Sequence, residues 1–287
     1  MIKTSIIVLT YNSAAHIEKL VKSIYKYNIN GNFETVIVDN ASQDDTVGKI
    51  LQLKSYDLKL IQNKENVGFS KGINIGAKEA SGKYLLFINP DTQWNDGSIN
   101  NLISVFEKDE GTGIVGGKII NDSGKSEKSA GKFLGILGTL ILTLGLDEAL
   151  GFRFSPGQLQ EVDFVSGGFM MVRSDVFRNL GGFDENYFMY VEDMDLCLRA
   201  KKENYKTYFS PSAIILHKGQ GSSSRSFAIK NIYKGLIYFN KKHGNNLSLL
   251  LIKSLLVFKA SVLVLLGKII NNKYLVLSYK EALKSIV

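Results

Sequence analysis

The sequence predicts an α/β layered fold built around a largely parallel sheet. Four short runs of β-branched and apolar residues predict strands, and they are mostly continuous rather than alternating, which is typical of strands buried on both faces. They cover 3–9, 33–39, 58–63 and 83–89. Between them, apolar residues recur at helical spacing. These helical segments cover 14–27, 46–54 and 72–80.

The second half of the chain is less regular. Two segments combine apolar runs with paired glycines, and they cover 164–177 and 180–188. Leu196 and Ala200 lie four residues apart, so we expect a helix from about Glu192 to Asn204 with these two side chains facing the core. Residues 205–217 are interpreted as a pair of strands.

With 287 residues, of which 45% are hydrophobic, the chain is long enough for one large domain or for a domain with an appendage. The single cysteine, Cys197, excludes an internal disulfide framework. The first residues run straight into a strand-like segment with no cleavage site, so we expect a protein that is cytoplasmic or lies on the cytoplasmic side of a membrane. The uncharged segment 133–146 is shorter than the roughly 20 residues of a spanning helix, and we interpret it as a mobile flap or a membrane-dipping segment.

The net charge of +8 is unevenly distributed. Residues 1–225 carry 25 Lys and Arg against 26 Asp and Glu, whereas 226–287 carry 10 lysines and one glutamate. Uniform basicity would indicate nucleic acid as a partner, but a neutral body with a basic, apolar tail does not. The tail therefore forms a region of its own in this interpretation.

Polar, turn-forming residues follow all four predicted strands of the first half. They are Thr10 to Asn12, Asp39 to Ser42, Asn63 to Gly68 and Asn89 to Asp91. In parallel sheets ligands sit beyond the carboxyl ends of the strands, so four such ends together favour a polar ligand. Each end by itself could equally be a loop or a helix cap.

Two of these carboxylates have specific interpretations. Asp91 follows a strand and a proline, where a carboxylate could hold a divalent cation against a diphosphate or could merely close an Asx turn. Asp39 could accept a hydrogen bond from a nucleobase imide or a ribose hydroxyl, or could cap the next helix.

Two further signals are weak when taken singly. The glycine-rich segment 66–76 opens a helix beside Lys71 and suits a phosphate, although it fits neither the dinucleotide fingerprint nor the Walker pattern. His217 ends an apolar run and is either a hydrogen-bonded structural residue or a ligand of a cation held by Asp91. His16 and His243 are interpreted as surface residues.

The stretch EDMD places three carboxylates in four positions at a helix start. Asp195 and Arg199 are four apart and would form an exposed ion pair worth about 0.3–0.5 kcal/mol, and Glu192 could cap the helix. Asp193 is crowded by like charges and aromatic residues, which should raise its pKa towards the range of a general base. The three acids could equally have a purely structural role at the start of the helix, and the stretch by itself does not decide between this role and a general base.

Seven motifs occur along the chain in a fixed order. They are SIIVLTYN, VIVDNAS, NVGFSKGIN, FINPDT, VSGGFMMV, GGFDENYFMYVEDMDLCLRAKKENY and LHKGQGSS. This set resembles the inverting family 2 glycosyltransferases, in particular the rhamnosyltransferase-like branch that builds surface polysaccharides. The resemblance covers roughly residues 3–221 and implies a GT-A fold, a three-layer α/β/α sandwich, over 1–225. The helical tail 226–287 lies outside it.

The resemblance also implies roles for individual residues, with Mg²⁺ or Mn²⁺ as the cofactor. The implied donor-binding residues are Thr10, Tyr11, Asn12, Asp39, Asn40, Ser42, Asn66, Gly68, Lys71, Asn74, Asn89 and Asp91. Those implied to face the acceptor are Gly167, Gly168 and Glu192. Asp193 matches the catalytic base, and Asp91 and His217 match the metal ligands. Asn89 departs from the family's DXD motif, which leaves Asp91 as the only charged ligand there.

The resemblance implies a single displacement in which Asp193 takes the proton of an acceptor hydroxyl. We expect a dTDP- or UDP-linked sugar donor, with dTDP-rhamnose favoured and other hexose or galactofuranose donors as the alternative. The expected acceptor is a lipid-linked glycan. A non-catalytic sugar-nucleotide-binding subunit of a membrane complex is the competing interpretation, although such a subunit needs no base.

The tail segment 247–270 is apolar but interrupted by Lys253, Lys259 and Lys268, which argues against a spanning helix. On a helical wheel the lysines fall within one half and leave an apolar arc opposite. This pattern is typical of a helix that lies on an anionic membrane surface. We therefore expect a peripheral protein on the inner face of the cell membrane, with a core-packed or dimer-forming helix as the alternative.

Overall fold

The computed structural model describes residues 3–27, 32–94, 97–133, 135, 138–139, 141, 147–218 and 224–286. Most of the uncharged segment 133–146, expected to be a flap, therefore lies outside the described residues. The strands are β1 Thr4–Thr10, β2 Phe33–Asp39, β3 Leu58–Gln62, β4 Tyr84–Ile88, β5 Thr92–Trp94, β6 Thr112–Asn121, β7 Ala130–Gly131, β8 Arg153–Phe154, β9 Gln160–Glu161, β10 Phe164–Val165, β11 Phe169–Arg173 and β12 Lys206–His217. The helices are α1 Ile17–Tyr27, α2 Thr46–Gln52, α3 Phe69–Lys78, α4 Ser98–Lys108, α6 Ser174–Asn179, α7 Glu192–Lys202, α8 Arg225–His243, α9 Asn246–Ile269 and α10 Lys273–Lys284.

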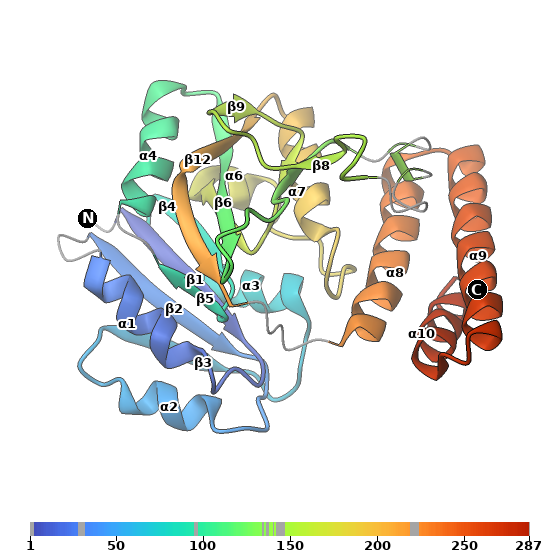
Figure 1. Ribbon diagram of the computed structural model, residues 1–287. Coiled ribbons are helices and arrows are strands. Elements are labelled where there is room, and N and C mark those ends of the chain that lie inside the picture. The colour runs from blue at the N-terminus through green and yellow to red at the C-terminus, as the bar shows by residue number, and fades with distance from the viewer. Residues whose placement is uncertain are drawn as a thin grey trace.

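A large central sheet dominates the molecule, with strand order β3-β2-β1-β4-β11-β6-β12-β5 and β9 paired to β12 (Figure 1). The pairs β1–β2, β2–β3, β1–β4 and β6–β12 are parallel. Strand β11 runs antiparallel between β4 and β6, and β5 and β9 run antiparallel to β12. The prediction of a mostly parallel sheet is confirmed.

Helices cover both faces of this sheet. One face packs against α1, α2 and α4 through a cluster that includes Ile6 and Val8 of β1, while Ile7 points to the opposite cluster under α3, α6 and α7. Because successive strand side chains point to opposite faces, both sets of β1 side chains are buried. This double burial explains why the strands appear in the sequence as continuous apolar runs.

Most predicted elements are confirmed with small shifts at their ends. The helix expected over 14–27 begins at Ile17, and the one expected over 72–80 begins at Phe69. Cys197 is fully buried on α7. The predicted pair of strands over 205–217 is wrong, because the segment is the single strand β12. Its register shifts between Ser210 and Ile214, at the position of Pro211, where a bulge accommodates a residue that cannot donate a ladder hydrogen bond.

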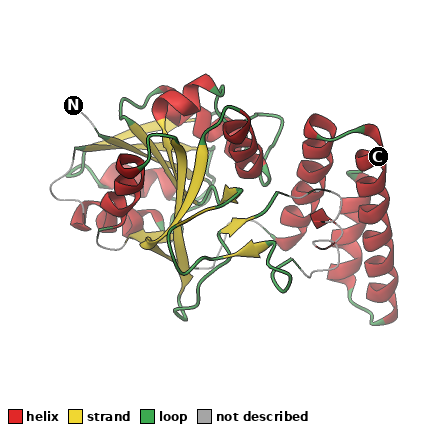
Figure 2. Ribbon diagram, turned by 90° about the horizontal axis from the view of Figure 1, so that it is seen from above, coloured by secondary structure: helices red, strands yellow, loops and turns green. Residues whose placement is uncertain are grey.

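The C-terminal helices α8, α9 and α10 pack on one another and stand to one side of the sheet in both views (Figure 2). They are not detached from the rest of the molecule. A third hydrophobic cluster joins Tyr187 and Met194 to Tyr233, Leu236 and Phe239 of α8. The boundary between 1–225 and 226–287 stays a prediction, but the two regions share this buried cluster.

Phe87 of β4 offers a direct test of the core. Its side chain is fully buried and its ring lies 5.2 Å from that of Phe177 and 5.3 Å from that of Phe183. We expect Phe87→Ala to lower the free energy of unfolding by about 3–5 kcal/mol, because it leaves a cavity. Urea denaturation measures this, and Leu51→Ala, at a side chain 53% exposed, should change it by no more than about 0.5 kcal/mol. Equal effects at both positions would contradict the assignment of the core.

Candidate active site

The polar residues predicted from the strand ends meet at one edge of the sheet. Thr10 and Asp39 end the paired strands β1 and β2, and Ile88 ends β4 beside β1. Because β11 is antiparallel, its amino end pairs with the carboxyl end of β4 through Phe169 and Ile88. The turn that precedes β11, which contains Gly167 and Gly168, is thereby brought to the same edge.

Asp39 organises the first part of this edge. Its carboxylate is 1% exposed and accepts hydrogen bonds from Thr10 Oγ1 at 2.8 Å, from Ser42 Oγ at 2.6 Å and from the Ser42 backbone N–H at 2.9 Å. Ser42 Oγ in turn accepts from the backbone N–H of Asn12 at 2.9 Å. The carboxylate therefore fixes the loops after β1 and β2 against each other, and Tyr11 and Asn12 remain partly or fully exposed.

Asn40 joins the next loop to this group. Its side chain is 2% exposed, donates to the carbonyl of Gly68 at 3.0 Å and to Asn66 Oδ1 at 3.3 Å, and accepts from Asn63 Nδ2 at 2.8 Å. Asn66 Oδ1 also accepts from the backbone N–H of Gly68 at 3.0 Å. The hydrogen bonds among these amide side chains therefore fix the shape of the loop.

Gly68 connects this loop to the segment before α7. Its φ of +85° is favourable only for glycine, and a Cβ there would lie 2.5 Å from the carbonyl oxygen of Phe188. The Phe69 backbone N–H donates to that same carbonyl at 2.6 Å. Lys71 in the first turn of α3 is exposed. It is the positively charged side chain of the glycine-rich segment 66–76.

Asn74 of α3 is bonded to the loop that precedes α7. It is 7% exposed, its Nδ2 donates to the carbonyl of Phe183 at 2.8 Å, and its Oδ1 accepts from the Phe183 N–H at 2.9 Å. Nδ2 also donates to Glu185. These bonds hold the 180–186 loop against α3, and the role of Asn74 in binding the sugar donor stays a prediction.

Asp91 and His217 meet at the far end of the site. Asp91 is 8% exposed and its Oδ2 lies 3.2 Å from His217 Nε2, while His217 Nδ1 lies 2.8 Å from Glu127 Oε1. The hydrogen bonds with Asp91 and then Glu127 raise the pKa of His217 to about 10. Burial acts to raise the pKa of Asp91, but the hydrogen bond and charge of His217 outweigh it and leave that pKa below its usual value.

One carboxylate oxygen of the Asp91–His217 pair is available to bind a divalent cation. Asp91 Oδ1 is buried and has no hydrogen-bond partner among the described residues, so it offers an unused oxygen of the type that Mg²⁺ and Mn²⁺ prefer. Within the described ranges, no group of three or more His, Cys, Asp or Glu side chains is arranged to hold a metal. Asp91 thus fits a cation that takes its other ligands from substrate phosphate and water, as Mg²⁺ commonly does. His217 bonds a carboxylate through each ring nitrogen and has a raised pKa, so it would have to lose a proton before it could be a ligand.

The turn at Gly167 and Gly168 joins the two halves of the site. The Asn89 backbone N–H donates to the Gly168 carbonyl at 3.2 Å, and a Cβ on Gly168 would lie 2.8 Å from Asn89 Nδ2. The Gly167 N–H donates to Asp193 Oδ2 at 3.1 Å. Asn89, the residue that departs from the DXD motif, is therefore bonded to Gly168, and the neighbouring Gly167 is bonded to Asp193, the carboxylate expected to be the base.

Asp193 and Glu192 differ in their surroundings although they are neighbours. Asp193 is half-buried and its Oδ1 also accepts from the Met194 N–H at 2.8 Å, whereas Glu192 is 5% exposed and its Oε2 has no partner. Burial raises the pKa of both carboxyls, and the charge of Asp193 raises that of Glu192 well above its usual value. The expected direction for Asp193 is confirmed, with burial as its main cause.

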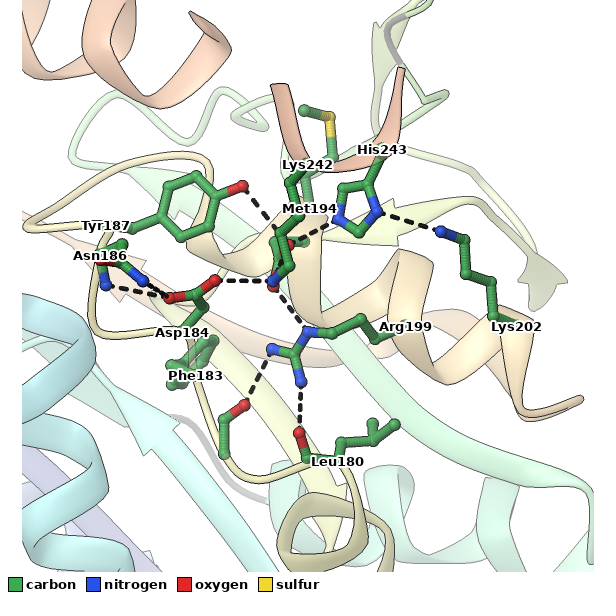
Figure 3. A network of polar contacts seen from close by, with 12 residues as sticks. Leu180, Phe183, Asp184, Asn186, Tyr187, Met194, Arg199, Lys202, Lys242 and His243 are labelled. Atoms are coloured by element: carbon green, nitrogen blue, oxygen red, sulfur yellow. Dashed lines mark hydrogen bonds and ion pairs between the residues drawn. The ribbon is translucent and has the colours of Figure 1, made fainter. Parts of the chain in front are cut away.

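Asp195 is the centre of a buried ionic network, and Figure 3 shows its partners Arg199, Lys242 and His243 converging from α7 and α8. It is fully buried and its carboxylate contacts Arg199 Nε at 2.7 Å, Lys242 Nζ at 2.8 Å and His243 Nε2 at 2.7 Å. The expectation of an exposed pair worth a few tenths of a kcal/mol is wrong, because α8 covers this face of α7. His243, expected at the surface, is 7% exposed for the same reason.

The network continues into the loop before α7. Arg199 donates to the carbonyls of Leu180 at 2.7 Å and Gly182 at 2.8 Å, and Lys242 also contacts Asp184 Oδ2 at 2.7 Å. Sequence reasoning missed these partners and Glu127. Glu127 and His217 are 90 positions apart, and no local pattern links residues at that separation.

Residues 5–181 match the family model of glycosyl transferase family 2. The chain belongs to glycosyl transferase family 2. This match includes the strand ends, Asp91 and the Gly167–Gly168 turn, and it ends before α7.

Two relatives of known function indicate which branch of the family this chain resembles. The chain is 27% identical over 245 residues to an N-acetylglucosaminyl-diphospho-decaprenol L-rhamnosyltransferase of Mycobacterium tuberculosis, which covers 77% of each protein. It is 32% identical over 210 residues to a low-salt glycan biosynthesis hexosyltransferase of Haloferax volcanii, covering 70% of this chain and 62% of that one. This family 2 member is therefore a rhamnosyltransferase-like glycosyltransferase of polysaccharide synthesis.

A solved structure supports the fold. The mannosyltransferase of Pyrobaculum calidifontis, solved with GDP-Man and Mn²⁺, aligns with a TM-score of 0.61 at 15% identity, over 99% of this chain and 85% of that one. At this identity the likeness shows the fold alone. The fold is GT-A, as the ordered motifs of this glycosyltransferase implied.

The ionic network around Asp184 gives a pH prediction. Burial acts to raise the pKa of Asp184, but hydrogen bonds from Lys242 and Asn186 outweigh it and lower the pKa from 3.8 to about 2. A carboxyl with a depressed folded-state pKa contributes stability above its unfolded pKa, and that contribution is lost as the pH falls towards the folded pKa. We expect Asp184→Asn to be less stable than the wild type above about pH 4, with a difference that shrinks towards pH 2. Denaturant unfolding across pH 3–6 measures this, and a pH-independent difference would contradict it.

Proposed function

We propose that the protein is an inverting glycosyltransferase that transfers a hexose, with L-rhamnose from dTDP-rhamnose favoured, to a hydroxyl of a lipid-linked glycan. The family assignment supports sugar transfer. The relative named for a diphospho-decaprenol acceptor and L-rhamnose transfer supports the choice of donor and acceptor. Other dTDP- or UDP-linked hexoses and galactofuranose remain the alternative donors.

The observation that carries this proposal is the environment of Asp193. Its Oδ2 is held by the Gly167 N–H at the same sheet edge as Asn89 and Asp91. A half-buried carboxylate with a raised pKa suits a general base, because it binds a proton more strongly than an ordinary aspartate. In the proposed single displacement, Asp193 accepts the proton of the acceptor hydroxyl as that oxygen attacks the anomeric carbon opposite the nucleotide.

The remaining residues bind and orient the substrates. The loops fixed by Asp39 and Asn40 present Tyr11, Asn12 and Lys71 to the nucleotide part of the donor. The turn at Gly167 and Gly168 lies between the base and Asn89, where the transferred sugar and the acceptor would meet. A cation held by Asp91, and by His217 once its imidazole has lost a proton, would neutralise the charge that develops on the departing diphosphate.

The decisive experiment measures transfer from dTDP-rhamnose to a polyprenyl-diphosphate-linked N-acetylglucosamine, with Mn²⁺ or Mg²⁺ present. We expect Asp193→Asn to lower the rate by about 10²–10⁴-fold, since the general base is lost, while nucleotide binding measured by calorimetry is retained. Glu203→Gln, an exposed carboxylate just beyond the same helix, serves as the matched control and should keep the wild-type rate.

Three outcomes separate the alternatives. Normal turnover by Asp193→Asn would contradict the base assignment. Turnover of another sugar nucleotide, but not of dTDP-rhamnose, would replace the proposed donor. A wild type that binds nucleotide yet transfers nothing from a broad donor panel would favour the non-catalytic subunit over the enzyme.

We also propose that the tail places the enzyme on the cytoplasmic face of the cell membrane. Among the helices described, α9 is long and apolar enough to cross a membrane by length and composition, with a mean hydropathy of 2.4. Ile252, Leu256 and Ala260 are buried, so one face of α9 packs on its neighbouring helices. The opposite face exposes a stripe of large apolar side chains. They include Leu247, Leu250, Phe258, Val262, Leu265 and Ile269.

The lysines favour an anionic lipid surface over a second protein as the occupant of this stripe. Lys253, Lys259 and Lys268 lie along the same helix, and residues 226–287 carry 10 lysines against one glutamate. Anionic headgroups complement this charge while the apolar stripe enters the interface. The packed face argues for a helix that lies on the membrane rather than one that spans it.

Vesicle binding tests this location. We expect the full-length protein to sediment with vesicles of phosphatidylglycerol and phosphatidylcholine and to be released at high salt and alkaline pH. The double variant Phe258→Asp, Leu265→Asp should stay in the supernatant, whereas Leu51→Asp, at an exposed side chain of α2, should bind like the wild type. Resistance to alkaline release would indicate a spanning helix, and a stable dimer without vesicle binding would indicate a protein interface.

A further inference from the structure

The backbone immediately before Glu192 and Asp193 is strained. Tyr190 and Val191 have φ values of +71° and +74°, in the left-handed region that non-glycine residues rarely adopt. Such positions are energetically unfavourable and persist only where the surrounding structure holds them. Val191 is β-branched, which makes the conformation less favourable still, and it is followed directly by Glu192 and Asp193.

This strained pair sets the start of α7. Val191 is the residue before the helix, and its carbonyl accepts the backbone N–H of Asp195 at 3.0 Å. The left-handed pair turns the chain so that Asp193 reaches the Gly167 N–H at 3.1 Å while Asp195 points the other way into the protein. Relaxation of Tyr190 and Val191 would therefore move the Asp193 carboxylate.

Helix α8 packs directly on this pair. Gly235 of α8 is buried, and a Cβ at that position would lie 2.9 Å from the carbonyl oxygen of Tyr190 and 2.8 Å from Val191 Cγ2. The helix backbone thus touches the strained backbone with no side chain between them. Because the φ of Gly235 is not in the left-handed region, close approach, rather than backbone conformation, requires glycine here.

The end of α8 contacts the first turn of α7 a second time. Lys242 and His243 bind the buried carboxylate of Asp195 at 2.8 and 2.7 Å, and Lys242 also binds Asp184 in the preceding loop (Figure 3). Arg199 of α7 itself is the third partner of Asp195. Burial lowers the pKa of His243, so this residue contributes a hydrogen bond, whereas Lys242 and Arg199 contribute positive charge. Two of the three partners of this carboxylate therefore come from the C-terminal region, outside the segment that matches the family.

We propose that α8 is a positioning element of the active site, with Gly235, Lys242 and His243 as positioning residues. Together they clamp the strained pair and the first turn of α7, and so keep the Asp193 carboxylate at the Gly167 amide. This inference rests on the proposed role of Asp193 as the base. It assigns a catalytic consequence to a helix that otherwise serves only to connect the tail.

The experiment compares two substitutions in α8 with matched controls in the full-length enzyme. Gly235→Ala places a methyl group against the Tyr190 carbonyl, and Lys242→Met removes the cation shared by Asp195 and Asp184. We expect each to lower kcat by about ten- to a hundredfold, since a displacement of about 1 Å can cost roughly 10²-fold, with the KM for the sugar nucleotide within about twofold of wild type. Lys242→Arg should recover most of the rate.

The controls make the same chemical changes at positions away from the contact between α8 and α7. Gly157→Ala adds a methyl group at a position with no atom within 4 Å, and Lys241→Met removes an exposed lysine of the same helix. Both should keep the wild-type kcat. Hydrogen exchange of the peptide covering 188–200 should be faster in Gly235→Ala and Lys242→Met and unchanged in the controls, which reads the position of α7 without any assay of activity.

The outcomes are distinguishable from those of the proposed function. If Asp193→Asn is inactive while folded Gly235→Ala and Lys242→Met keep the wild-type kcat, the positioning role is wrong and the base assignment stands. A fall in thermal stability without a change in kcat would likewise overturn it. If Gly235→Ala fails to bind nucleotide and is therefore misfolded, Lys242→Met decides. If Asp193→Asn is active, the base assignment has failed first.

Discussion

Strand β11 runs antiparallel between β4 and β6, and the arrangement of the site depends on this one reversal. In a sheet of parallel strands, only an antiparallel strand begins at the edge where the others end. The turn before β11 therefore reaches the strand ends that carry Asn89 and Asp91. Through the Gly167 N–H it also reaches Asp193. A parallel strand in this place would put the two glycines at the opposite edge, far from every other polar group of the site.

Asp91 and Asp193 have opposite environments. Asp91 faces His217, whose hydrogen bond and charge lower its pKa despite burial. Among the described residues, no cationic side chain is bonded to Asp193, and burial raises its pKa. This difference between the two pKa values is what the proposed function requires, with Asp91 as the charged group and Asp193 as the group that takes a proton. Both carboxylates are held by backbone or side chains from other elements, so the difference is a property of the folded chain.

Asp195 shows how the C-terminal helices became part of this arrangement. A fully buried carboxylate is tolerated only when cations and hydrogen bonds surround it, and removal of one partner of such a buried pair typically costs about 3–5 kcal/mol. Lys242 and His243 meet that requirement from α8. The same requirement fixes α8 against α7, beside the strained residues Tyr190 and Val191. The outer side of the C-terminal helices is apolar and exposed. The C-terminal region therefore contacts the site on its inner side and presents an apolar surface on its outer side.

The sequence by itself determined the α/β class, the strands and helices of the first half, and the polar strand ends, because periodicity and turn chemistry are local properties of the chain. The order of its motifs also determined the glycosyltransferase family. It did not determine that 205–217 is one bulged strand, that Asp195 is buried, or that the Asn74 amide bonds to Phe183. These depend on partners such as His243, 48 positions from Asp195, and Phe183, 109 positions from Asn74. Only the tertiary structure decides such contacts, since burial and pairing at that separation leave no pattern in neighbouring residues.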